Sequence, residues 1–160
     1  MPPRFAFRLS VPFGLIAWGI VTALYVWPAL RGLSPVDAIR PLLVLHSFRY
    51  LGLAFLVPGT VSPELPAAFA RPAALGDLIA ALLALLALGT LGTQVGTALV
   101  WVFNIWGSAD LLYAFFNGAR LVSDGKLLAT HFGAAYFIPT VYVPLLLITH
   151  GLVFWFLVFG

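Results

Sequence analysis

Long apolar stretches separated by short turn-like segments dominate the hydrophobic pattern of this chain. Five of them are long enough to cross a bilayer as helices, since about 20 residues rising ~1.5 Å each cover the ~30 Å hydrocarbon core. The expected spans are residues 10–30, 37–57, 74–91, 97–117 and 134–159. Residues 58–59 and the Gly- and Thr-rich stretch 89–97 predict breaks between spans. The pattern predicts an all-α integral membrane protein, a compact bundle of five transmembrane helices forming one domain over residues 1–160.

The composition supports lipid as the solvent of this chain. Of its 160 residues, 62% are hydrophobic and 8% are charged, against roughly 25% charged in a typical soluble domain. A globule of this size cannot hide so much apolar surface. The eight basic residues are scattered singly despite the net charge of +3, so we expect no nucleic-acid partner. The absence of Cys excludes disulfides and thiolate-held metal sites.

The distribution of basic residues predicts the orientation. The chain begins with a basic segment and then about 20 apolar residues, longer than the core of a secretory signal, so we expect a retained first span. A cytoplasmic N-terminus places five basic residues inside, namely Arg4, Arg8, Arg71, Arg120 and Lys126. It leaves Arg31 and Arg40 outside. The positive-inside rule therefore predicts a multi-pass protein of the cytoplasmic (inner) membrane with its N-terminus in the cytoplasm.

Polar side chains within three of the expected spans are the most informative feature. The fourth span carries Asn104 and Asp110, the second carries His46 and Arg49, and the fifth carries His150. Such groups cost a few kcal/mol if they face lipid. Counting ~1.5 Å per residue places His46, Asn104 and His150 ~10–13 Å below the outer face, and Arg49 and Asp110 ~18–20 Å below it. We expect a polar cluster among these spans, with Arg49 and Asp110 as a candidate buried ion pair.

This cluster is the candidate binding site. Tyr50 follows His46 at the i+4 spacing that places two side chains on one helical face. The expected ligand-binding residues are His46, Arg49, Tyr50, Trp101, Asn104, Asp110 and His150. The resulting hypothesis is a small membrane protein that binds or transports a small or lipid-like ligand, through a cluster open toward the outer leaflet.

Two alternatives remain open at this stage. Two histidines at one depth are also candidates for axial haem ligation, for another metal, or for a proton relay, with His46 and His150 as the residues involved. A structural or accessory subunit of a membrane complex, or a homo-oligomer, would use the polar residues only to fix helix packing.

The third span carries expectations of its own. Because residues 74–91 are almost entirely Ala and Leu, we expect this helix to face lipid or another copy of the chain. Asp77 is expected in its first turn, where a carboxylate complements the helix dipole. The prolines at 63, 66 and 72 predict that no regular helix crosses the segment before it.

No catalytic constellation is recognisable in the sequence. Ser47 and His46 are adjacent, so on a helix their side chains point about 100° apart and do not form a nucleophile–base pair. Lys126 lies in a predicted loop, so no intramembrane Lys is available for a retinal Schiff base. Phosphate-loop, dinucleotide-binding and zinc-protease motifs are absent from the sequence. An enzyme acting on a lipid is left without candidate residues.

Overall fold

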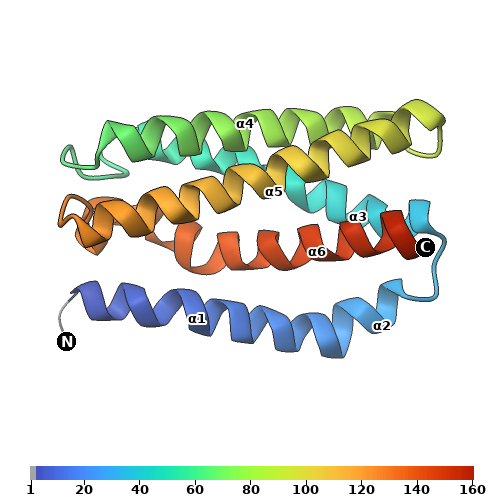
Figure 1. The fold of residues 1–160 in the computed structure, drawn as a ribbon, viewed down its shortest axis with the longest axis horizontal. Helices are drawn as coiled ribbons and strands as arrows, with labels where there is room; N and C mark the ends of the chain where they lie inside the picture. The colour runs from blue at the N-terminus through green and yellow to red at the C-terminus, as the bar shows by residue number, and fades with distance from the viewer. Residues whose placement is uncertain (1–2) are drawn as a thin grey trace.

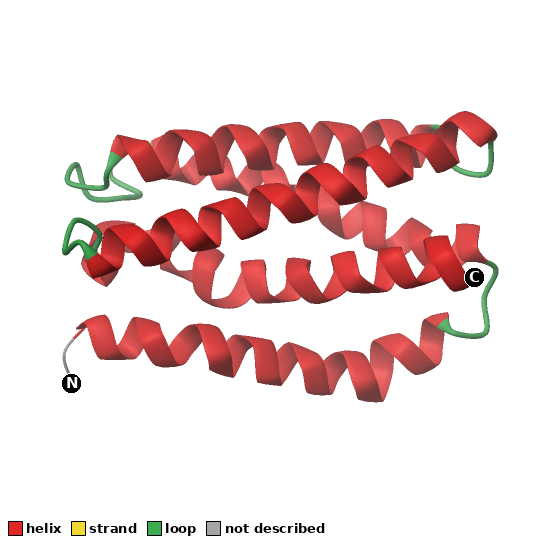
Figure 2. Ribbon diagram, in the orientation of Figure 1, coloured by secondary structure: helices red, strands yellow, loops and turns green. Residues whose placement is uncertain are grey.

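The computed structural model describes residues 3–160, which form helices joined by short loops and contain no β-strand (Figure 2). Five helices are long and apolar enough to cross a membrane: Phe5–Leu30, Pro35–Leu56, Ala67–Gly89, Gln94–Ser123 and Ile138–Phe159. They run along the long axis of the molecule as one bundle (Figure 1). The expected all-helical architecture with five long apolar helices is confirmed.

Several of the long helices combine different helix types. The first consists of α1 (Pro3–Val21), the π-helical η1 (Thr22–Val26) and α2 (Trp27–Leu30). The second consists of α3 (Pro35–Ser47) and the 3₁₀ helix η2 (Phe48–Leu56). The third and fourth are α4 (Ala67–Gly89) and α5 (Gln94–Ser123). The 3₁₀ segment η3 (Ala129–Tyr136) leads into the last, formed by the π-helical η4 (Ile138–Tyr142) and α6 (Val143–Phe159).

The third helix begins at Ala67, earlier than the predicted start at residue 74, and it contains Pro72. Proline has no N–H, so the carbonyl of Ala68, four residues before it, loses its helical donor. The side chain of Asn117 on α5 takes the place of that donor, with Nδ2 lying 2.9 Å from the Ala68 oxygen. The expectation that the prolines exclude helix as far as residue 72 was therefore wrong. A neighbouring helix supplies the hydrogen bond that the proline removes.

The early start of α4 changes the position of Asp77. From Ala67 to Asp77 the helix rises ~15 Å, so this carboxylate lies well inside the bundle rather than in the first turn. It is buried. The prediction that Asp77 complements the dipole at the start of its helix was wrong.

The two faces of α4 have different roles. Its buried face is made of small residues, including Ala70, Ala73, Ala74, Gly76, Ala80, Ala81, Ala84 and Ala87. This face packs against α3, η2 and α5, because small side chains let helix backbones approach closely. Leu75, Leu82, Leu85 and Leu86 point outward. We expected this helix to face lipid or another copy of the chain; only its Leu-bearing face is exposed, and its small-residue face is buried in the bundle.

The first helix is the peripheral one. In its most apolar stretch no residue is buried, and it packs on α6, η3 and η4. Trp18 attaches it to the last helix, since its indole N–H donates to the Val141 carbonyl over 3.0 Å.

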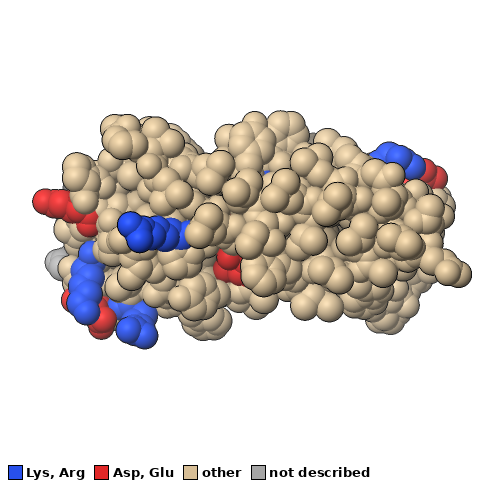
Figure 3. All heavy atoms as spheres, turned by 90° about the horizontal axis from the view of Figure 1, so that it is seen from above, with Lys and Arg blue, Asp and Glu red and all other residues tan. Residues whose placement is uncertain are grey.

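On the face that Figure 3 shows, charged side chains gather toward the ends of the long axis, and the surface between them is largely uncharged apart from a small acidic patch. The N-terminus lies at the same end as the loops that follow η2 and α5 (Figure 1). The C-terminus and the loops after α2 and α4 lie at the other end.

Candidate functional site

A fully buried arginine occupies the centre of the bundle. Arg49 lies on η2, whose buried residues are Arg49, Gly52 and Phe55. This spacing of three matches the three residues per turn of a 3₁₀ helix. Arg49 has no exposed surface, so its charge must be satisfied entirely by protein groups.

The guanidinium of Arg49 contacts four acceptors. Nε donates to Oδ1 of Asp77 on α4, and Nη2 donates to Oδ2 of Asp110 on α5, each over 2.8 Å. Nη1 lies 3.1 Å from the Gly107 carbonyl and 3.1 Å from Nε2 of His150. Arginine provides five N–H groups in a planar fork, which suits this number of partners. One side chain therefore connects η2, α4, α5 and α6.

The partners of His150 fix its protonation. A guanidinium can only donate, so Nε2 of His150 accepts the bond from Arg49. Its proton is then on Nδ1, which lies 2.6 Å from Oδ1 of Asn104. The Asn104 amide donates back to the His150 carbonyl over 3.2 Å. The imidazole of His150 is thus neutral. We call Arg49, Asp77, Asp110, Asn104 and His150 the Arg49 cluster.

His46 lies beside this cluster, with its ring tilted against that of His150. Its ring centroid is 4.2 Å from that of His150, and its Nε2 is 3.0 Å from the Thr149 hydroxyl. That hydroxyl is 2.9 Å from the Leu145 carbonyl, to which it donates, so Nε2 of His46 is the donor to Thr149. Nδ1 of His46 has no hydrogen-bond partner within residues 3–160.

Three glycines make room for the cluster. A Cβ on Gly52 would overlap the Asp77 carboxylate, and one on Gly76 would overlap the Asp110 carboxylate. A Cβ on Gly107 would lie 2.7 Å from Nη1 of Arg49. Glycine within a helix costs roughly 0.5–1 kcal/mol relative to alanine. At these positions its lack of a side chain lets three helices close around charged groups.

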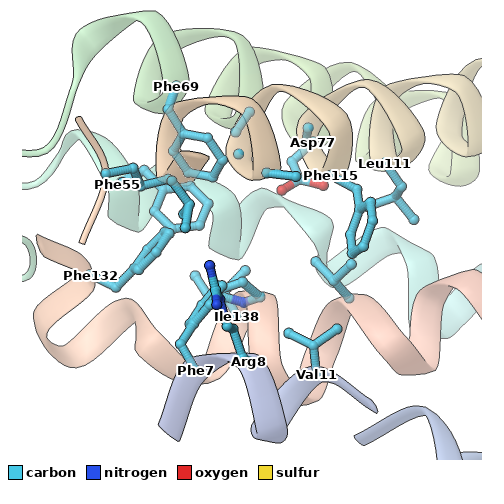
Figure 4. A pocket seen from close by; sticks show the side chains of 18 of the residues that line it. Phe7, Arg8, Val11, Phe55, Phe69, Asp77, Leu111, Phe115, Phe132 and Ile138 are labelled. Carbon is cyan, nitrogen blue, oxygen red and sulfur yellow. The ribbon is translucent and has the colours of Figure 1, made fainter. Parts of the chain in front are cut away.

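A cavity of about 430 Å³ lies next to the Arg49 cluster (Figure 4). Its apolar lining includes Phe7, Val11, Phe55, Phe69, Phe115 and Phe132. The polar side chains among its described lining residues are Arg8, Ser123, Asp77 and Asp110. Arg8 and Ser123 are exposed, whereas the side chains of Asp77 and Asp110 are only 9% and 10% exposed. The two carboxylates are therefore the least exposed polar groups in the lining of an otherwise apolar cavity.

The structure brings together five of the seven predicted site residues. The side chains of His46, Arg49, Asn104, Asp110 and His150 form a continuous group in which neighbours are hydrogen-bonded or have their rings in contact. The two layers inferred from depth are in fact connected, since Arg49 contacts both Asp110 and His150. Of these five residues, the cavity reaches Asp110.

The other two predicted residues lie elsewhere. Tyr50 is 47% exposed, because the chain turns about 120° per residue in a 3₁₀ helix rather than 100°, which rotates it away from His46. Trp101 packs against Phe154 with ring centroids 6.1 Å apart. Neither residue belongs to the cluster, and predicting their place in it was wrong.

Sequence reasoning missed Asp77 as a member of the cluster. The available signal was a carboxylate in the middle of an Ala-rich apolar stretch, once Pro72 is placed inside the helix. The position of the cavity was also unexpected. Much of its lining comes from α1, the first half of α4 and the second half of α5, with further residues from η2, η3 and η4, at the end that carries the N-terminus (Figure 1). The opening that we expected lies at the opposite end of the bundle.

The geometry of the two imidazoles gives no support to an axial pair for haem or another metal. A metal held by both would lie ~2.0–2.1 Å from a nitrogen of each ring. Here the rings lie in direct contact, with centroids 4.2 Å apart and planes tilted by 48°, and three of their four nitrogens are hydrogen-bonded. Within residues 3–160, no group of three or more His, Asp or Glu residues is arranged to hold a metal ion.

The comparisons with known proteins give a family and no activity. Neither the curated proteins nor the solved structures include a significant match to this chain. The model of one domain family of unknown function, DUF8737, matches residues 6–158. Because that match covers nearly the whole sequence, the chain belongs to the DUF8737 family.

Proposed function

We propose that this protein is a multi-pass protein of the cytoplasmic membrane that binds a small lipid-like molecule in the cavity beside the Arg49 cluster. The observation that carries the proposal is the combination of an apolar cavity with two mostly buried carboxylates in its lining. Its volume of about 430 Å³ falls within the ~300–1,000 Å³ of small-molecule sites, which are mostly apolar with a few placed polar groups.

The rim of the cavity favours entry from the lipid. Leu15 on α1 and Phe115 on α5 both line it and are 37% and 49% exposed. These residues lie within the long apolar helices, at the level of the bilayer core in our proposed orientation. A lipid-like molecule could therefore enter sideways between α1 and α5, without crossing the aqueous ends of the bundle.

Binding is better supported than transport. On the far side of the Arg49 cluster the bundle is filled by fully buried side chains, among them Phe103, Val100 and Val153. A ligand in the cavity has no continuation toward the end that carries the C-terminus. With the N-terminus in the cytoplasm, as the basic residues favour, the cavity belongs to the inner-leaflet half. This replaces our expectation of an opening toward the outer leaflet.

Photolabelling with a matched pair of variants tests the proposal. The probe is dodecanol carrying a diazirine, added to the purified protein in detergent, with labelled peptides identified by mass spectrometry. Ala114→Trp fills the cavity wall, because Ala114 lines it. Leu112→Trp adds the same bulk on the exposed side of the same helix, where Leu112 is 48% exposed.

The expected result is labelling of peptides containing the buried lining residues Phe69 and Phe132 in the unmodified protein and in Leu112→Trp, with at least a fivefold loss in Ala114→Trp. Equal labelling of the cavity peptides in both variants would mean that the probe reacts from the surrounding detergent. That result, or labelling confined to outward residues, would refute binding in the cavity.

A further inference from the structure

The Arg49 cluster contains one more carboxylate than its arginine can neutralise. Asp77 and Asp110 each contact Arg49, and His150 is neutral because it accepts from the same guanidinium. Two ionised carboxylates and one guanidinium leave a net charge of −1 at a site that is only about one-tenth exposed. An unbalanced charge in such surroundings is costly, so it must be met by a proton or by a cation.

We infer that the ligand of the cavity is a lipophilic amine, and that binding of its ammonium group displaces the proton that otherwise balances Asp77 and Asp110. This inference rests on the proposed function, since it names the chemical class of the molecule in the cavity. An alkyl chain fits the aromatic lining, and an ammonium N–H donates to the oxygens of the two carboxylates in that lining.

The other titratable groups around the two carboxylates do not remove the excess charge. From η2 the facing group is Arg49, already counted, and from α6 it is the neutral His150. Tyr142 of η4 is committed as a donor to the Leu45 carbonyl over 3.2 Å. From α1 the facing group is Arg8, which lines the cavity and is exposed. At the solvated rim its charge is strongly screened.

Figure 4 shows this arrangement, with Asp77 on one side of the cavity and Arg8 reaching in from the other. The carboxylate end of the cavity therefore favours a cation, and the aromatic lining favours an apolar chain. A monoamine with one long apolar part satisfies both, because its single charge reaches the carboxylates and its chain remains among the aromatic residues.

The exchange balances in charge and atoms. Without ligand, one proton is shared by the carboxylate pair. The incoming ammonium keeps its three protons and donates hydrogen bonds to the carboxylate oxygens, while the acid proton leaves to water. One positive charge enters the site and one leaves it, so the buried cluster stays neutral throughout.

Two probes that differ only at the polar end test this inference: diazirine-bearing dodecylamine and diazirine-bearing dodecanol. At pH 7.5 we expect the amine to label the cavity peptides at concentrations at least fivefold lower than the alcohol. Over the pH range in which the ligand-free carboxylate pair holds its proton, the proton competes with the ammonium group. Amine labelling should therefore weaken tenfold per pH unit of acidification, while alcohol labelling should stay constant. In weakly buffered solution, binding of dodecylamine should release up to one proton per protein, measured with an indicator dye.

Variants test whether the preference for the amine over the alcohol arises from Asp77 and Asp110. Asp110→Asn and Asp77→Asn should each lower amine labelling toward that of the alcohol. Asp124→Asn removes an exposed carboxylate outside the cavity (43% exposed side chain) and should keep the full preference. Because the pH series uses the unmodified protein, the test holds even if a variant at the cluster does not fold.

The outcomes separate the two proposals. Equal, pH-independent labelling of the cavity by both probes would overturn the amine inference and leave lipid-like binding intact. Absence of cavity labelling by either probe would overturn the proposed function itself. Amine preference that survives both Asn variants at the cluster would also overturn the inference, since the charge responsible would lie elsewhere.

Discussion

Gly76 of α4 lies directly against the carboxylate of Asp110 on α5, so that a methyl group at position 76 would occupy the place of the carboxylate oxygens. The ion pair between Asp110 and Arg49 therefore depends on a missing side chain on a third helix. An alanine at position 76 of α4 would exclude the ion pair between Asp110 and Arg49.

Replacement of Gly76 by Ala is expected to displace Asp110 from Arg49. Overpacking a filled interior costs about 1–3 kcal/mol, and breaking a buried ion pair costs about 3–5 kcal/mol. Since the carboxylate can shift toward the cavity, we expect a loss of about 2–4 kcal/mol in the free energy of unfolding. Denaturant unfolding in detergent, followed by circular dichroism, measures it.

Gly151→Ala is the matched control for this substitution. Gly151 lies in α6 next to His150, and a Cβ there meets no atom within 4 Å. Alanine in place of a helical glycine should be neutral or stabilise by up to about 1 kcal/mol. Equal losses for the two variants would contradict the role given to Gly76.

The bond between Asn117 and the Ala68 carbonyl should matter only because of Pro72. Asn117→Ala removes a hydrogen bond worth about 0.5–1.5 kcal/mol. Pro72→Ala restores the N–H that bonds the same carbonyl within the helix. In the Pro72→Ala background, Asn117→Ala should therefore cost less than half as much. A double-mutant cycle of unfolding free energies measures this coupling, and additive effects would show that Asn117 acts through other contacts.

Removing the charge of Arg49 alone should be far worse than removing all three charges of the ion pairs. Arg49→Met leaves Asp77 and Asp110 buried without a cation, at an expected cost of about 3–5 kcal/mol. The triple variant with Asp77→Asn and Asp110→Asn restores neutrality and should recover most of that loss. The folded yield by size-exclusion chromatography and the unfolding midpoint report both effects. A triple variant no more stable than Arg49→Met would indicate that the hydrogen-bond geometry matters more than the charge.

The absence of Cys in the sequence allows the orientation to be tested with single cysteines. Leu33 lies in the loop after α2 and is 47% exposed, while Lys126 lies in the loop after α5 with a side chain 67% exposed. In intact cells, a membrane-impermeant maleimide should label Leu33→Cys and not Lys126→Cys, and in broken cells it should label both. Labelling of Lys126→Cys alone in intact cells would reverse the proposed orientation.

The sequence was most informative about polar residues inside apolar helices. The helical rise per residue predicted that His46, Asn104 and His150 lie at one depth and that Arg49 and Asp110 lie at another. The structure confirms both groupings. This worked because each polar group in an apolar span needs a partner, and helical rise relates sequence number to depth.

What could not be predicted depends on departures from ideal helices and on packing. The 3₁₀ turn at η2 moved Tyr50 away, and α4 begins before Pro72 with a bond from Asn117, so that Asp77 lies well inside the helix and not in its first turn. Residual space, such as the cavity between α1 and α5, is set by how side chains of different helices fit together. No single helical pattern contains that information.

Native mass spectrometry of the protein released from mild detergent tests most directly whether the cavity holds a ligand. We predict a bound lipid-like amine that is retained by the unmodified protein and by Leu112→Trp and is absent from Ala114→Trp. If all three proteins carry the same adduct, or if none of them carries one, a binding site at the Arg49 cluster is contradicted.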